Sequence, residues 1–229
     1  MQDDIITTTL DAIAAVAGQP MPDAAYRAYI GRTVIPETLR RWGFEQRFYA
    51  EQPFIQAQEE VYQHAGRLLR GTGAIVALIG KRGTGKTSIA AKIARDQAWR
   101  NYESSIGEPG TPVVARHVVY CKATKLVARY KPLFADFGSV ETETLLKSLD
   151  FLCREQELLV IDELHDCYDL KAQRRVLTDL IDRRYSMLRD TILISNQTAD
   201  DFCATAGESI LSRLSEHGAI LECTWESFR

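Results

Sequence analysis

The amino-acid sequence predicts an α/β fold with a parallel sheet between helices, and three observations support this prediction. Short apolar segments of strand length alternate with longer segments whose apolar residues recur at helical spacing. A glycine-rich loop follows the first apolar segment and opens directly into a helical pattern. A later apolar segment ends in two adjacent acids. Such alternation is typical of a parallel sheet that helices cover on both faces, with the functional site at the carboxyl ends of its strands.

The expected sheet has five strands, and helical patterns separate most of them. The strands are expected at residues 74–79, 113–121, 158–163, 191–195 and 219–223. Helices are expected at residues 56–70, from 88 onward, and at 123–137, 141–153, 170–185 and 209–216. Residues 104–112 are rich in turn formers, and Pro132 should bend or split the helix that contains it.

Two regions are expected along the chain. Residues 51–229 hold the strands and are expected to form the main domain. Residues 1–50 are too few to hold a strong core alone, so we expect a small helical appendage there.

The glycine-rich loop runs from Gly80 to Thr87 and reads Gly-Lys-Arg-Gly-Thr-Gly-Lys-Thr, the pattern of a phosphate-binding loop. Its glycines allow backbone N–H groups to point at an anion, and the following helix N-terminus adds partial positive charge. We expect Lys86 to reach the β- and γ-phosphates and the Thr87 hydroxyl to ligate Mg²⁺. A chance glycine-rich turn is the alternative, but the strand before the loop and the helix after it favour a nucleotide site. The expected nucleotide contacts are Lys81, Arg82, Gly83, Thr84, Gly85, Lys86, Thr87 and Ser88.

Asp162 and Glu163 end the third apolar segment, where isolated buried carboxylates would be costly. We expect Asp162 to hold Mg²⁺, directly or through water, and Glu163 to orient and deprotonate the attacking water. The alternative is a pair of exposed acids at a strand end, and the phosphate-binding loop upstream weighs against it.

Asn196 and Arg213 are the remaining candidates for catalysis. Asn196 follows the fourth strand, where its amide could lie between the catalytic acid and the γ-phosphate; alone it would be an ordinary turn residue. Ser195 is a weaker candidate for the same role. Arg213 has the planar fork suited to a transferring phosphate, although an isolated helix arginine is usually solvated. Its order after the acid pair and Asn196 favours the functional interpretation.

The composition is that of an ordinary globular protein of 229 residues, with 45% hydrophobic and 26% charged residues and a net charge of −3. No apolar run reaches the length of a membrane span, and the acidic start Met-Gln-Asp-Asp is unlike a secretory signal. The five cysteines are scattered without a Cys-x-x-Cys pair, which is typical of free thiols in a reducing compartment. We therefore expect a cytoplasmic protein that contacts no membrane.

Several of these motifs together resemble AAA+ ATPases of the DnaC/IstB type, which are bacterial and phage helicase loaders and transposition helper ATPases. The resemblance rests on the phosphate-binding loop, the Leu-Leu-Val-Ile-Asp-Glu segment, the strand before Asn196, the Ser-Arg-Leu element around Arg213, and the final Trp-Glu-Ser-Phe-Arg. It covers residues 34–229. The Asp-Arg-Arg run at residues 182–184 and the aromatic end are more similar to the loader branch.

The resemblance implies a five-stranded parallel sheet, ATP with Mg²⁺, and ATP-dependent self-association in which Arg213 acts on the ATP of a neighbouring subunit. The chain ends just after the fifth strand, so no C-terminal helical lid is expected. The resemblance also implies that the appendage at residues 1–50 binds the partner, and that single-stranded DNA lies in a central pore. Basic residues near Tyr130 could contact its backbone while that ring stacks on a base; the alternative is a solvated basic helix face. The basic residues are Lys122, Lys125, Arg129 and Lys131.

Three functions share these motifs. The first is a loader that uses ATP to deliver a replicative helicase to DNA. The second is a transposition helper that assembles on duplex DNA and recruits a transposase. The third is an ATP-gated adaptor with little hydrolysis, for which Glu163→Gln would leave partner loading unchanged. The aromatic end and the Asp-Arg-Arg run favour the loader.

Overall fold

A computed structural model describes residues 54–106, 117–134, 140–154, 156–166 and 168–228 of the chain. The helical appendage predicted for residues 1–50 lies outside these ranges, so its boundary with the main domain remains a prediction. Within the described residues, no helix is both long enough and apolar enough to cross a bilayer.

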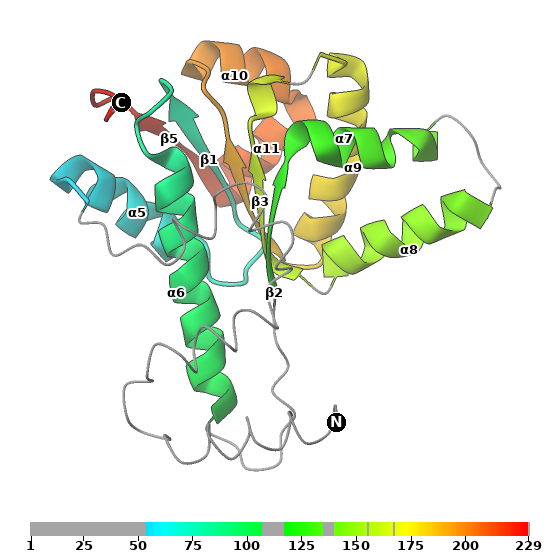
Figure 1. Ribbon diagram of the computed structural model, residues 1–229, viewed down its shortest axis with the longest axis horizontal. Helices are drawn as coiled ribbons and strands as arrows, with labels where there is room; N and C mark the ends of the chain where they lie inside the picture. The colour runs from blue at the N-terminus through cyan, green and yellow to red at the C-terminus, as the bar shows by residue number, and fades with distance from the viewer. Residues whose placement is uncertain (1–53, 107–116, 135–139, 155, 167, 229) are drawn as a thin grey trace.

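The described strands form one parallel sheet of five, as predicted (Figure 1). Their order is β2-β3-β4-β1-β5, so β1 lies between β4 and β5, and β3 lies beside β4. The parallel arrangement brings the carboxyl ends of β1, β3 and β4 to one edge, where the phosphate-binding loop, the acid pair and Asn196 follow them. The strands are β1 (Ile75–Gly80), β2 (His117–Lys122), β3 (Gln156–Asp162), β4 (Asp190–Ile194) and β5 (Gly218–Cys223).

Helices cover both faces of the sheet because its central strands are apolar on both sides. In β1, Val76 and Leu78 join one buried cluster with α5 (Gln56–Leu68) and α6 (Lys86–Ile106). Ala77 and Ile79 face the opposite cluster with the remaining helices (Figure 1). Those helices are α7 (Ala123–Tyr130), α8 (Val140–Arg154), α9 (Leu170–Ser186), α10 (Ala199–Ala206) and α11 (Glu208–His217), with short 3-10 turns η1 (Lys131–Phe134) and η2 (Leu164–Asp166).

The structure differs from the sequence prediction in two local places and agrees with it at Pro132. Helix α10 was not predicted; its N-cap is Thr198, whose hydroxyl accepts the N–H of Asp201. Helix α6 continues to Ile106, through residues expected to begin a turn. Pro132 has the predicted effect, since α7 ends at Tyr130 and the chain continues as η1.

Two buried polar residues, Asp190 and Arg184, lie at the end of the sheet opposite the site. The Asp190 carboxylate, at the start of β4, accepts the N–H groups of four successive residues in the turn before β1, at 2.7 to 3.1 Å. The Arg184 guanidinium is fully buried and donates to the carbonyls of Leu152, Glu157 and Asp190 and to the Thr191 hydroxyl. These bonds tie α9 to α8 and to the first residues of β3 and β4.

Candidate nucleotide-binding site

The phosphate-binding loop connects β1 to α6, and its glycines have backbone conformations that other residues rarely adopt. Gly80, Gly83 and Gly85 have φ values of 126°, 88° and 85°. A Cβ on Gly80 would lie 2.5 Å from the carbonyl oxygen of Cys223, and one on Gly85 would lie 2.5 Å from Nε2 of Gln58. Glycine is therefore required at Gly80 by both backbone conformation and space, and at Gly85 by backbone conformation, since the Gln58 side chain there could move.

Lys86 lies inside this loop. Its Nζ donates to the carbonyl oxygens of Gly80 at 2.8 Å and Lys81 at 2.7 Å, and its side chain is almost fully buried. Burial lowers the pKa of the ammonium, with Cys223 and Asp162 acting in the opposite direction. The ammonium thus lies beside the backbone that would cradle a phosphate.

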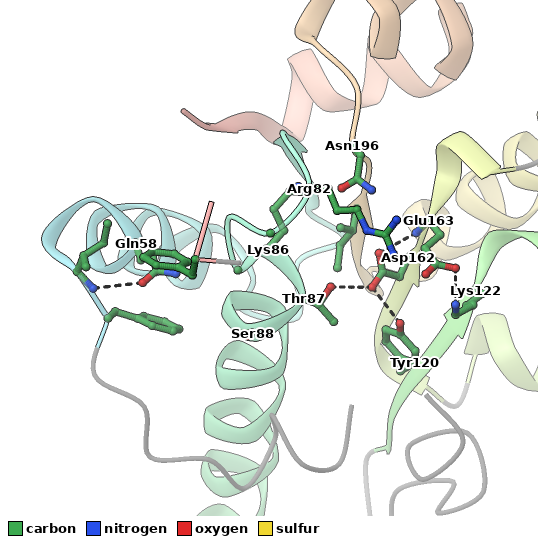
Figure 2. A pocket seen from close by; sticks show the side chains of 16 residues that line it. Gln58, Arg82, Lys86, Thr87, Ser88, Tyr120, Lys122, Asp162, Glu163 and Asn196 are labelled. Atoms are coloured by element: carbon green, nitrogen blue, oxygen red, sulfur yellow. Dashed lines mark hydrogen bonds and ion pairs between the residues drawn. The ribbon is translucent and has the colours of Figure 1, made fainter. Parts of the chain in front are cut away.

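Asp162 lies next to the start of α6 (Figure 2). Its Oδ2 accepts the Thr87 hydroxyl at 2.9 Å and the Tyr120 hydroxyl at 2.9 Å. Burial, and then the Asp162 charge, raise the pKa of Tyr120, so its hydroxyl keeps the proton that it donates. A carboxylate and an aliphatic hydroxyl in contact are the hard oxygen ligands that Mg²⁺ prefers beside substrate phosphates, so these residues fit the ion.

Glu163 is held by Lys122, a contact that the sequence interpretation did not anticipate. Its carboxylate Oε2 lies 2.5 Å from Nζ of Lys122, and its backbone has a φ of 58°, unusual for a residue other than glycine (Figure 2). Lys122 and Asp162 are paired in register at the ends of β2 and β3. The left-handed conformation turns the chain after β3, so Glu163 lies beside Asp162 in the same cavity.

Asn196 follows β4 and is anchored by His165. The backbone N–H of Asn196 donates to Nδ1 of His165 at 3.3 Å, and its amide nitrogen lies 3.0 Å from Nε2. His165 in turn lies 3.0 Å from Asp166. His165 therefore connects Asn196 to the turn after the acid pair.

One cavity of about 480 Å³ contains these groups, a volume in the range of small-molecule sites. Its polar part is lined by the loop, Lys122, the acid pair and Asn196, and its other part by Phe54, Ile55 and Phe228. Six of the eight expected nucleotide contacts line it: Arg82, Gly83, Gly85, Lys86, Thr87 and Ser88. The two others do not: Lys81 is exposed and Thr84 is fully buried under the loop.

Arg213 is not among the residues that line this cavity in its own chain. It lies on α11, where its Nε is 3.0 Å from Oδ1 of Asp182 and its guanidinium lies over the Tyr185 ring at 5.5 Å. It also donates to the carbonyl and hydroxyl of Ser209. These contacts fix the side chain away from the cavity of its own subunit.

The basic residues predicted to contact DNA have separate environments. Lys122 belongs to the cavity, whereas Lys125, Arg129 and Lys131 are exposed. The Tyr130 ring is only 3% exposed, and its hydroxyl lies 3.0 Å from the Ser148 hydroxyl. The expectation that Tyr130 stacks on a base is therefore wrong, because its ring is packed in the core.

The fold, the loop and the order of the polar strand ends define a P-loop NTPase fold of the AAA+ class. No family model matches the chain. The chain is 26% identical over 151 residues to the replicative helicase loader DnaC of Escherichia coli, covering 66% of this chain and 54% of that protein. It is 28% identical over 154 residues to an uncharacterized Escherichia coli protein, YdaV, with 67% and 54% covered. The matched part thus spans about half the length of these curated relatives.

Solved structures show the same fold. The crystal structure of the DnaC helicase loader matches with a TM-score of 0.55 at 19% identity, covering 80% of this chain and 98% of that one. The crystal structure of DnaI matches with a TM-score of 0.53 at 18% identity, covering 80% and 93%. The replication initiator DnaA bound to AMPPCP and single-stranded DNA matches at 0.51 and 16%, covering 80% and 50%. The resemblance to AAA+ ATPases of the DnaC type is confirmed.

Proposed function

We propose that this chain binds and hydrolyses ATP and loads a replicative helicase onto DNA. The observation that carries the proposal is the single cavity that unites the phosphate-binding loop with the acid pair and Asn196. The similarity to DnaC, a replicative helicase loader, supports the choice of partner. No contact in the described residues favours the transposition helper over the loader.

Each residue of the cavity has a role in this proposal. Lys86 and the loop N–H groups bind the phosphates, and Asn196 orients the attacking water. Glu163 accepts a proton from that water. Mg²⁺ held by Thr87 and Asp162 would stabilise the charge on the phosphate oxygens. The apolar part of the cavity, at Ile55 and Phe228, suits the base of the nucleotide.

Glu163→Gln should lower the rate of ATP hydrolysis by about a hundredfold or more, because an amide cannot accept the proton of the attacking water. The dissociation constant for ATP should change little, since the loop and Lys86 bind the phosphates. Steady-state phosphate release and ATP titration measure the two effects. Hydrolysis at the wild-type rate would exclude Glu163 as the base.

We also propose that the chain self-associates with ATP and that Arg213 acts on the ATP of a neighbouring subunit. Its contacts with Asp182 and Ser209 would then orient the guanidinium at the subunit surface before the neighbouring subunit binds. Arg213→Ala should reduce hydrolysis by roughly a thousandfold and leave ATP affinity nearly intact. Phosphate release and ATP titration on the same preparation test this, and normal hydrolysis would contradict a shared site.

The exposed residues Lys125, Arg129 and Lys131 are the proposed contacts to the backbone of single-stranded DNA. Arg129 and Lys131 also bond to Ser148 and Asp169. The first bond joins α7 to α8, and the second joins η1 to the N-cap of α9, so both bonds orient these basic side chains.

Capture of a purified replicative helicase from the same host, with ATP and with ADP, tests the proposed partner. The loader predicts nucleotide-dependent capture that is lost when residues 1–30 are deleted. ATP-dependent assembly on duplex DNA without helicase capture would instead indicate the transposition helper.

A further inference from the structure

The segment after β5, residues 224–228, contains most of the aromatic end that the sequence analysis singled out, and it lies against the outer side of the phosphate-binding loop. We call it the post-β5 segment. Trp225 donates its indole N–H to the carbonyl oxygen of Thr84 at 2.8 Å. The backbone N–H of Phe228 donates to the carbonyl oxygen of Gly83 at 3.1 Å.

Gln58 on α5 supports the same part of the loop from a different region of the chain. Its Nε2 donates to the Thr84 carbonyl at 3.3 Å, while its Oε1 accepts the N–H of Ile55 at 3.2 Å (Figure 2). A carbonyl oxygen has two lone pairs, so Thr84 can accept from Gln58 and Trp225 together. Two consecutive loop carbonyls therefore point outward at three fixed donors.

The direction of these carbonyls determines the direction of the N–H groups that would bind phosphate. The described chain contains no cis peptide, and in a trans peptide the C=O and the following N–H point in opposite directions. With the carbonyls of Gly83 and Thr84 held outward, the N–H groups of Thr84 and Gly85 point to the opposite, inner side of the loop. N–H groups aligned in this way form an anion-binding concavity.

Two of the three donors, Gln58 and Trp225, are themselves anchored. Gln58 is 6% exposed, and Trp225 packs against the buried cluster that includes residues of β1, α5 and α6. A Cβ on Gly85 would lie 2.5 Å from Nε2 of Gln58 and 3.9 Å from the Phe228 ring, so these side chains lie directly on the loop. Losing either Trp225 or Gln58 would leave the Thr84 carbonyl with one of its two donors, at a cost of about one hydrogen bond.

From this arrangement, we infer that Trp225, Phe228 and Gln58 are positioning residues for nucleotide binding: they hold the Gly83 and Thr84 carbonyls outward so that the loop N–H groups face the phosphates. The inference rests on the proposed function, because it requires the loop to bind a nucleoside phosphate. It assigns the aromatic end of the chain a role in the affinity for phosphates.

The test compares Trp225→Phe with the full-length wild-type chain by isothermal titration with ADP and with inorganic pyrophosphate, both with Mg²⁺. Phenylalanine keeps an aromatic ring and loses only the N–H donor and part of the ring. The dissociation constants of ADP and pyrophosphate should both rise by the same factor, about threefold to tenfold, as for one hydrogen bond. Glu226→Ala, in the same segment and exposed, is the control and should bind both probes as the wild type does.

The thermal midpoint without nucleotide separates positioning from simple packing. If Trp225 only stabilised the fold, Trp225→Phe would lower that midpoint and leave both dissociation constants unchanged, which would overturn the inference. If the wild-type chain bound neither ADP nor ATP, that result would contradict the proposed function, and the inference, which rests on it, would be contradicted too.

A second pair of variants decides the question if Trp225→Phe does not fold. Phe228→Ala and Phe228→Pro both remove the ring, but only proline also removes the N–H that donates to Gly83. ADP affinity about threefold or more weaker in the proline variant than in the alanine variant would support the inference. Equal affinities would contradict it.

Discussion

Lys86→Ala should weaken ATP binding by about a hundredfold or more, because charge-assisted hydrogen bonds to phosphate are roughly twice as strong as neutral ones. In the structure the Lys86 ammonium lies among the loop carbonyls and reaches the polar part of the cavity. Alanine removes the only loop side chain that is both buried and positively charged. Titration with a fluorescent ATP analogue measures the change in the dissociation constant.

Lys147→Ala is the matched control, because the Lys147 side chain is 76% exposed on α8 and pairs with Glu143 one turn before it. The control should bind ATP as the wild type does. Thermal unfolding of both variants without nucleotide establishes that they are folded. ATP binding by a folded Lys86→Ala at wild-type affinity would exclude the loop as the nucleotide site.

Arg184→Met should lower the free energy of unfolding by about 3 to 5 kcal/mol, because it removes four buried hydrogen bonds worth about 1 kcal/mol each. Methionine fills part of the volume but leaves the carbonyls of Leu152, Glu157 and Asp190 without this donor. Burial lowers the Arg184 pKa to about 10, so the guanidinium is still charged near neutral pH. Urea denaturation measures the loss.

The neighbouring residue supplies the control for this prediction. Arg183 is in the same helix, is 42% exposed and pairs with Asp179 one turn earlier. Arg183→Met should therefore cost no more than about 0.5 kcal/mol. Equal losses for the two variants would mean that the bonds of Arg184 contribute little to stability.

Most of the fold could be predicted because its signals are local. The strands are short apolar runs between glycines and polar residues, and the order of helices and strands alone implies a parallel sheet. Helix α10 was missed because it is short, and its N-terminal signal, Thr198 before two acids, follows a strand end that was interpreted as functional. The Asp-Arg-Arg run was singled out for its resemblance to loaders, and its structural role could not be seen: Arg184 is buried by elements distant in sequence.

The candidate site was predictable where one motif fixes both residue type and position, as at Lys86 and Asp162. Lys122 was assigned to DNA because it is close in sequence to other basic residues. Its position at the end of β2, paired with Asp162 at the end of β3, was a usable signal for the cavity. The contacts of Gln58 and Trp225 with the loop could not be predicted, since these residues meet the loop only through the fold.

Loading of a replicative helicase onto circular single-stranded DNA tests the central proposal most directly. A circular strand has no free end onto which the helicase could thread, so the helicase needs a loading protein. Unwinding of a strand annealed to the circle reports that loading has occurred. We predict unwinding with the wild-type chain and ATP, and none with Lys86→Ala. Unwinding that needs ATP but is unchanged by Glu163→Gln would indicate an ATP-gated adaptor. Equal unwinding with and without the wild-type chain would contradict the proposed function.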